Sequence, residues 1–264
     1  MLKLYQGRTA VCSVKVRLTM AEKSLDFEPV NLDLRAGDQH KLEYLKLNPN
    51  GVVPTLIHDD FVLIESSVIM QYLDENFPGQ SLQPTDAKDR AGMRIWMKRV
   101  DEYLHPGIGA LIYAMVHAAS MRKKNPAELE AHYRAIPSPA TRELQRAAIE
   151  HGMDAPAAVQ ALQAYDKALT DMELQLTKRP WLAGDGYSLA DAAMTPYINR
   201  LAMLGLSNMW ALTRPDVSAW FERTKARSSF DKAITTFVTD ADLKPYAGLD
   251  TWAWRKAEQL LKAT

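Results

Sequence analysis

The stretch that decides the fold reads Asn48-Pro-Asn-Gly-Val-Val-Pro-Thr-Leu-Ile-His-Asp-Asp-Phe-Val-Leu-Ile-Glu-Ser66. Its two short apolar runs, residues 55–57 and 62–64, are separated by an Asp-Asp turn and predict a β-hairpin. The following Glu65-Ser66-Ser67 is typical of the start of a helix. Pro54 stands at the entrance of the first strand, where a proline cannot donate to the strand ladder. Such a residue indicates that the backbone before the strand is needed elsewhere, for example by a ligand.

Composition narrows the class of protein. The chain has 264 residues and 47% hydrophobic content, enough to bury the core of one large domain or two modest ones. Lys plus Arg number 32 and equal Asp plus Glu, without runs of like charge, so neither a nucleic acid nor a membrane surface is expected as partner. The single cysteine excludes an internal disulfide and fits a reducing compartment. With no recognisable signal peptide or membrane span, we expect a cytoplasmic protein that binds a small molecule.

The hairpin lies within a segment that alternates strands and helices. Alternating apolar residues predict strands at residues 2–5 and 30–34, and helical spacing predicts helices from Ser13 to about residue 24 and from Glu65 to residue 77. Residues 79–87 are rich in turn formers and read as a linker. We therefore predict an α/β domain at residues 1–80 and a second domain at residues 88–264.

The second domain is helical in its periodicity throughout. An apolar stripe runs from Met93 to Leu104, where Pro106 is expected to interrupt the helix, and another runs from Leu162 to Leu176. Ser188-Leu-Ala-Asp191 has the pattern of a capping box. The predicted architecture is α/β followed by all-α.

Taken together, these pieces resemble the glutathione S-transferase family, in its theta-like and nu-like forms. The motifs that carry the resemblance, in order, are Lys15–Lys23, Asn48–Pro54, Glu65-Ser66 and Gly186–Asp191. The resemblance implies a thioredoxin-like N-terminal domain, an all-α C-terminal helical bundle, glutathione as cosubstrate and a homodimer.

Two further segments resemble the bacterial β-aryl ether-cleaving branch of this family. They are residues 96–103 and the inserted residues 131–139 with the following Arg146.

The resemblance also implies which residues hold glutathione. Val53 would present its backbone to the cysteinyl amide, with the Val53–Pro54 peptide bond in cis. Glu65 would pair with the γ-glutamyl ammonium, and the Ser66 hydroxyl and amide would bind its carboxylate. His40, assisted by Gln39 or Lys41, would bind the glycyl carboxylate. The residues alone fit Glu65-Ser66 as a plain helix cap equally well, and His40 as a solvated loop residue.

The central chemical task is to keep the glutathione thiol ionised. A free thiol has a pKa of about 8.5, and lowering it by about two units takes about 2.7 kcal/mol. Ser13 fits best, because it would sit at the N-terminus of the first helix with its hydroxyl toward the strand-end loop. Its alternative role is to cap that helix. Thr9 is a second hydroxyl in the same loop.

Cys12 leaves a different reaction open. The run Cys12-Ser13-Val14 also resembles beta-class transferases, in which this cysteine forms a mixed disulfide with glutathione. Cys12 would then carry thiol–disulfide exchange or deglutathionylation. Its alternative role is a half-buried residue without chemistry.

The second substrate is expected to be a small hydrophobic or aromatic electrophile held by the helical domain. Tyr103, His105 and Tyr113 lie on its first long helix and could line that pocket or donate a proton to a phenolate leaving group. Packing is their alternative role. The sequence thus predicts a glutathione transferase without a metal site, with a Cys12-dependent thiol transferase and a non-catalytic glutathione-binding protein as alternatives.

Overall fold

The computed structural model describes residues 1–134, 136 and 138–263. The chain forms two compact units, each assembled from separated segments. The first unit contains residues 1–98, 178–196 and 219–242, and the second contains residues 99–177, 197–218 and 243 onward. The domain boundaries predicted between residues 80 and 88 stay a prediction. Of the predicted insertion at 131–139, Ala135 and Pro137 lie outside the described residues.

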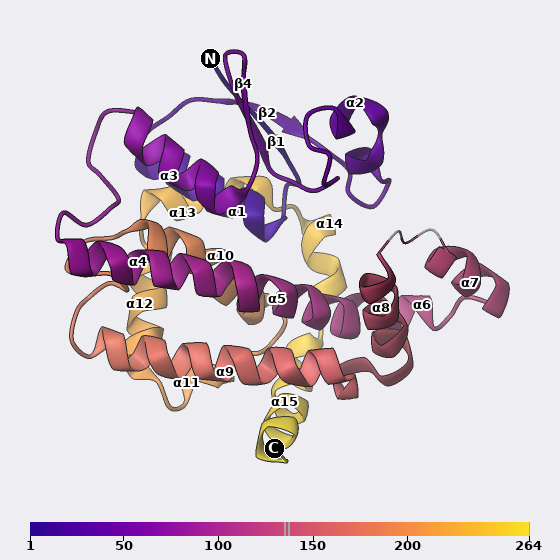
Figure 1. The fold of residues 1–264 in the computed structure, drawn as a ribbon. Coiled ribbons are helices and arrows are strands. Elements are labelled where there is room, and N and C mark those ends of the chain that lie inside the picture. Colours follow the sequence, from indigo (N-terminus) through magenta and orange to yellow (C-terminus); the bar gives the residue numbers. More distant parts are fainter. Residues whose placement is uncertain (135, 137, 264) are drawn as a thin grey trace. The chain divides into compact units, whose positions relative to one another are not determined.

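The first unit is built on a four-stranded sheet of order β2-β1-β3-β4 (Figure 1). The strands are β1 (Leu2–Gln6), β2 (Glu28–Asn31), β3 (Thr55–His58) and β4 (Phe61–Leu63). β1 pairs in parallel with β2 and antiparallel with β3, and β3 and β4 form the predicted hairpin. Leu4, which is fully buried, faces Pro29 on one side and Leu56 on the other. This sheet and the helices that follow it confirm the predicted fold class.

Helix α1 (Val11–Glu22) is the buried centre of this unit. It packs against α3 (Ser66–Asn76) and against α13 (Ser228–Ala233). Because it is covered on several sides, its apolar residues do not form one stripe, and it begins two residues before the predicted start at Ser13.

The second strand ends earlier than predicted. The alternating pattern predicted residues 30–34, but β2 ends at Asn31. The Asp33 carboxylate accepts hydrogen bonds from the backbone N–H groups of Arg35 and Ala36. This turn replaces the strand ladder, and the chain continues through η1 (Asp38–His40) and α2 (Leu42–Leu45).

The predicted capping box is present at the start of α10 (Leu189–Met203). The buried Asp191 carboxylate accepts from the backbone and hydroxyl of Ser188, from the backbone N–H of Leu182 and from Nε1 of Trp220. Burial raises the pKa of Asp191, although these hydrogen bonds oppose the shift. Trp220 lies on α12 (Pro215–Lys225). This carboxylate therefore joins three segments of the first unit.

The second unit is helical. After α4 (Ala87–Arg99), the π-helical turn η2 (Val100–Leu104) leads into α5 (His105–Ile112), with Pro106 in its first turn. α5 packs on α9 (Pro156–Leu176), where a Cβ on Gly107 would lie 3.2 Å from the Cβ of Ala161. The Tyr165 hydroxyl donates to the Leu104 carbonyl, so the interruption predicted at Pro106 is stabilised by a side chain.

Shorter elements complete the chain. They are η3 (Tyr113–His117), α6 (Ala118–Met121), α7 (Pro126–Arg134), α8 (Pro139–His151), η4 (Gly152–Asp154), α11 (Asn208–Ala211), η5 (Thr235–Phe237), α14 (Asp240–Leu243), η6 (Lys244–Tyr246), η7 (Leu249–Thr251) and α15 (Ala253–Lys262). Among the described residues, no helix has the length and apolar character needed to cross a membrane.

Candidate functional site

At the start of α3, Glu65 and Ser66 present a carboxylate and a hydroxyl that are unpaired within the described part of the chain. Glu65 is exposed and precedes the helix with a φ of 69°, which is uncommon for a residue with a side chain. Its side chain does not cap the helix, and within residues 1–134, 136 and 138–263 neither its carboxylate nor the Ser66 hydroxyl has a hydrogen-bond partner. The plain capping role is therefore not what this structure has. The carboxylate is available to an ammonium group, and the Ser66 hydroxyl and N–H to a carboxylate.

The backbone before β3 is held rigidly from one side. The Val53–Pro54 peptide bond is cis, as predicted. The Val52 carbonyl accepts from the Tyr44 hydroxyl at 2.6 Å and from Nδ2 of Asn48 at 2.8 Å. Because the Tyr44 proton is used there, the Tyr44 oxygen accepts from the Thr55 hydroxyl at 2.9 Å.

The main chain of Val53 itself is left open. In the described part of the chain nothing hydrogen-bonds to its N–H or carbonyl, so both can pair with a peptide ligand. Sequence reasoning missed Tyr44 and Asn48 as the residues that fix this turn. The Asn-Pro entry was the signal that could have pointed to Asn48.

His40 lies against the same turn. It is exposed at the end of η1, and a Cβ on Gly51 would come within 2.9 Å of its Nδ1. Because Gly51 also has a φ of 61°, a glycine is required here on two grounds. Nε2 of Gln39 donates to Nε2 of His40 at 3.2 Å, so the structure brings these two predicted residues together beside the turn.

Lys41 is engaged elsewhere. Its ammonium pairs with Asp38 at 2.7 Å, and this hydrogen bond lowers the pKa of Asp38 and raises that of Lys41.

The three thiolate candidates have different surroundings: Thr9 lies in the loop between β1 and α1, and Cys12 and Ser13 lie in the first turn of α1. Ser13 is fully buried in the first turn of α1, and its Oγ accepts from the backbone N–H of Gly7 at 3.3 Å. It does not cap the helix, because the N-cap position belongs to Ala10. Thr9 and Cys12 are both half-buried.

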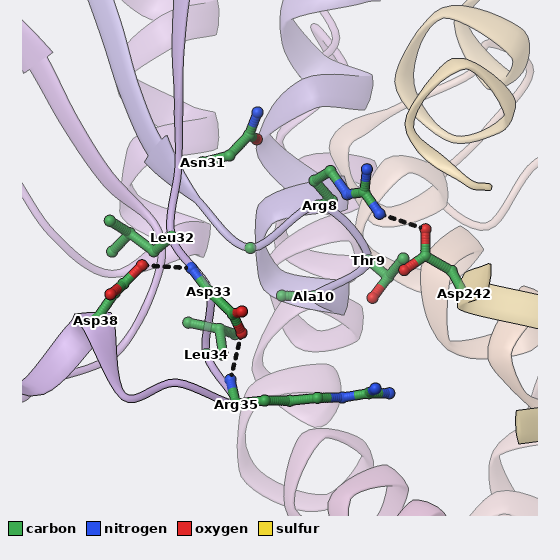
Figure 2. Close-up of a pocket in the computed structure, with 11 residues that line it drawn as sticks. Arg8, Thr9, Ala10, Asn31, Leu32, Asp33, Leu34, Arg35, Asp38 and Asp242 are labelled. Carbon is green, nitrogen blue, oxygen red and sulfur yellow. Dashed lines mark hydrogen bonds and ion pairs between the residues drawn. The ribbon is translucent and has the colours of Figure 1, made fainter.

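Thr9 also lines a cavity of about 450 Å³ (Figure 2). The remaining lining comes from the loop after β1, the segment after β2 and one residue distant in sequence from both: Gly7, Arg8, Ala10, Asn31, Leu32, Asp33, Leu34, Arg35, Asp38 and Asp242. Nη2 of Arg8 pairs with Oδ2 of Asp242 at 2.7 Å. Burial works to raise the pKa of Asp242, but hydrogen bonds from Thr239 and Arg8 outweigh it and lower that pKa.

Arg35 differs from the other charged residues of this cavity. Asp33 accepts from backbone N–H groups, Asp38 from a backbone N–H and from Lys41, and Arg8 pairs with Asp242, whereas the Arg35 guanidinium has no partner among the described residues. Figure 2 shows it extended away from the loop. Sequence reasoning did not single out Arg8, Arg35 or Asp242, because nothing local in the sequence brings them together.

The three residues predicted to contact the second substrate, Tyr103, His105 and Tyr113, each have different neighbours in the structure. Tyr103 is 62% exposed and lines a cavity of about 290 Å³ with Arg99 and Asp171. Nδ1 of His105, which is exposed, lies 3.2 Å from the Tyr197 hydroxyl.

Tyr113 is the most enclosed of the three. Its hydroxyl lies 3.0 Å from Nε2 of His132, and its ring packs against a cluster containing Tyr133 and Ile149. Burial raises the pKa of Tyr113 to about 12, so it is a weak acid in these surroundings.

Comparison with known proteins places this geometry in a family. Residues 1–75 match the model of the glutathione S-transferase N-terminal domain, and residues 112–228 match that of the C-terminal domain. Protein LigF of Sphingobium sp. strain SYK-6 is 34% identical over 232 residues, covering 86% of this chain and 90% of LigF. The chain belongs to the glutathione S-transferase family. The predicted family, transferase activity and glutathione cosubstrate are thereby confirmed.

Three further comparisons extend over most of this glutathione S-transferase. The tetrachloro-p-hydroquinone reductive dehalogenase of Sphingobium chlorophenolicum is 30% identical over 247 residues, covering 88% of this chain and 95% of the dehalogenase. The crystal structure of the β-etherase LigF superposes with a TM-score of 0.77 and 33% identity, covering 88% of this chain and 98% of that one. Glutathione transferase F7 of Populus trichocarpa gives a TM-score of 0.70 at 28% identity, covering 90% and 100%.

Proposed function

We propose that this glutathione S-transferase cleaves β-aryl ethers. The observation that carries the proposal is the similarity to the β-etherase LigF over 88% of this chain. The glutathione thiolate attacks the carbon that bears the ether oxygen, so a carbon–sulfur bond forms as the carbon–oxygen bond breaks. The electron pair leaves with the phenolate, which takes up a proton. The products are a glutathione thioether and a phenol.

Glutathione is held along the turn and the head of α3. Glu65 pairs with the γ-glutamyl ammonium, and Ser66 binds the adjacent carboxylate. The open main chain of Val53, next to Pro54, pairs with the cysteinyl unit. His40 and Gln39 bind the glycyl carboxylate. Support comes from the absence of other partners for Glu65, Ser66 and Val53 among the described residues.

Thr9 contacts the sulfur in this proposal. Thr9 is half-buried and lines the cavity beside the loop, whereas Ser13 is fully buried. The electrophile occupies this cavity, next to the loop. The roles predicted for Tyr103, His105 and Tyr113 toward the electrophile stay predictions.

A second candidate function is a glutathione thiol transferase that uses Cys12. The specific observation in its favour is the place of Cys12, half-buried in the first turn of α1, where the helix dipole favours a thiolate.

The decisive experiment identifies the products by mass spectrometry after incubation with glutathione and an α-keto β-aryl ether. A glutathione thioether and a free phenol are expected. Turnover of a glutathione mixed disulfide without ether cleavage would support the Cys12 reaction instead. Retention on a glutathione column without any turnover would support a binding protein.

We also propose a cytoplasmic homodimer, in keeping with the family. A solution mass of twice 29.7 kDa by light scattering is the expected result. A mass of a single chain at micromolar concentration would contradict it.

A further inference from the structure

The proposed reaction makes no use of Arg17, a buried charged residue of α1. The Arg17 side chain is 2% exposed, and its guanidinium donates only to neutral groups. Nε donates to the Ala233 carbonyl at 2.8 Å, Nη1 to Oε1 of Gln6 at 2.7 Å and Nη2 to the Arg8 carbonyl at 2.8 Å. The ring centroid of Phe237 lies 4.0 Å from its central carbon. Burial lowers the pKa of Arg17 to about 9, so the side chain keeps its charge at neutral pH.

A buried charge of this kind is costly to the fold. Within the described residues no carboxylate forms an ion pair with Arg17, so its desolvation is offset only by hydrogen bonds and the aromatic ring. An apolar side chain of similar volume would pack at this position without that cost. The groups that the guanidinium holds indicate what it contributes.

One of its three acceptors, the Arg8 carbonyl, belongs to a residue that lines the cavity described above, and a second, Gln6, hydrogen-bonds to another lining residue, Asn31. The Arg8 carbonyl is part of the loop that carries Thr9. Gln6, at the end of β1, in turn donates from Nε2 to Oδ1 of Asn31, at the end of β2, at 3.1 Å. Arg8 and Asn31 both line the cavity (Figure 2). One guanidinium therefore fixes the loop and the neighbouring strand end relative to each other.

The third acceptor, the Ala233 carbonyl, connects Arg17 to a segment far along the chain. Ala233 ends α13, and the segment continues through Phe237 in η5 to Asp242. The Asp242 carboxylate binds the Arg8 side chain at 2.7 Å. Arg8 is thus held twice: Arg17 donates to its backbone carbonyl, and Asp242 pairs with its side chain.

We propose that Arg17 is a positioning residue for the loop of residues 7–10 between β1 and α1, which we call the thiolate loop. By holding the Arg8 carbonyl, it keeps Thr9 where its hydroxyl reaches the glutathione sulfur. The proposal rests on the proposed function, because it takes the sulfur to lie at Thr9. It adds a residue that touches neither substrate but controls how well the thiol is ionised.

The test measures the pKa of the bound glutathione thiol from thiolate absorbance in the enzyme–glutathione complex, without a second substrate. Arg17→Met is expected to raise this pKa by about one unit or more. It should lower kcat by about tenfold while changing KM for glutathione less than about threefold, because the peptide is held elsewhere. Arg17→Lys keeps the charge but cannot donate to three acceptors at once, so an intermediate thiol pKa is expected.

Leu18→Ala is the matched control, since Leu18 is fully buried on the same helix. It should lower the thermal stability and leave the thiol pKa unchanged. If Arg17→Met does not fold, Arg17→Lys read against Leu18→Ala carries the test. A wild-type thiol pKa in a folded Arg17 variant would overturn the proposal. A wild-type enzyme that does not lower the thiol pKa would overturn the proposed function, and this inference with it.

Discussion

Glu65 combines a backbone conformation that costs of order 1–3 kcal/mol with a carboxylate that has no partner among the described residues. A residue that served only the fold would be expected to relieve this backbone strain. The conformation and the exposed carboxylate are both compatible with a ligand that carries an ammonium group. At the scale of single residues, the glutathione site can therefore be tested one group at a time.

Glu65→Gln removes the charge and keeps the shape. Loss of a charge-assisted hydrogen bond at an exposed site should raise KM for glutathione about tenfold and change kcat less than about twofold. Steady-state kinetics at varied glutathione measures both. Glu75→Gln, an exposed position at the other end of α3, is the control and should leave KM unchanged. An unchanged KM for Glu65→Gln would contradict the assignment.

Thr9→Ala and Ser13→Ala separate the two hydroxyls. Thr9→Ala should raise the pKa of the bound glutathione thiol by about one to two units, because a hydrogen bond to the thiolate is lost. Ser13→Ala removes the acceptor of a buried Gly7 N–H, so it should cost about 1–3 kcal/mol of stability and leave the thiol pKa in place. Thiolate absorbance and urea unfolding measure the two effects. A raised thiol pKa in Ser13→Ala together with an unchanged thiol pKa in Thr9→Ala would instead assign the thiolate contact to Ser13.

At the scale of elements, the relative positions of several segments depend on single carboxylates or carbonyls that accept hydrogen bonds from more than one segment. Asp191 joins the start of α10, the preceding loop at Leu182 and α12 through Trp220. The Val52 carbonyl does the same for the turn before β3, with Tyr44 and Asn48. Such groups position whole elements, because removing one leaves several buried donors unsatisfied.

Asp191→Ala is expected to be among the more destabilising substitutions in the first unit. It leaves the N–H groups of Leu182, Ser188 and Trp220 without their acceptor, which should cost about 3–5 kcal/mol. Urea unfolding followed by circular dichroism measures the loss. Asp185→Ala is the control, since the Asp185 side chain is 83% exposed, and should change stability by less than about 0.5 kcal/mol. A loss of stability as small as that of the control would show that the hydrogen bonds to Asp191 do not stabilise the first unit.

At the scale of the whole molecule, glutathione should stabilise the native state by mass action. At a concentration about 100-fold above its Kd the gain is about 2.7 kcal/mol. For a chain of this size that corresponds to a rise in Tm of about 5–10 °C.

Differential scanning fluorimetry with S-methyl glutathione, which keeps the peptide but cannot form a thiolate, should give a similar rise. Glu65→Gln should reduce both shifts at the same concentration. No shift in the wild-type protein at millimolar glutathione would contradict a preformed peptide site.

Local signals in the sequence were enough for the hairpin, the start of α3 and the capping box at Asp191, whereas the cis bond before β3 was implied by the family resemblance. Each of these depends on residues within a few positions of one another, where backbone preferences and capping decide the conformation. The strand predicted through residue 34 was too long for the same reason, because the Asp33 turn competes locally with the ladder and alternation alone does not reveal it.

The sequence by itself thus determined the family of folds and, through its resemblance to the glutathione S-transferases, the thiol cosubstrate. Only the tertiary structure decided the surroundings of the thiolate loop and of the first turns of α1. Ser13 reads as an accessible hydroxyl at a helix start, yet packing around α1 buries it completely. Arg17 reads as an ordinary helix charge, yet its partner Ala233 lies 216 residues further along the chain. Burial and long-range hydrogen bonds depend on which distant segments meet, and no local pattern encodes that.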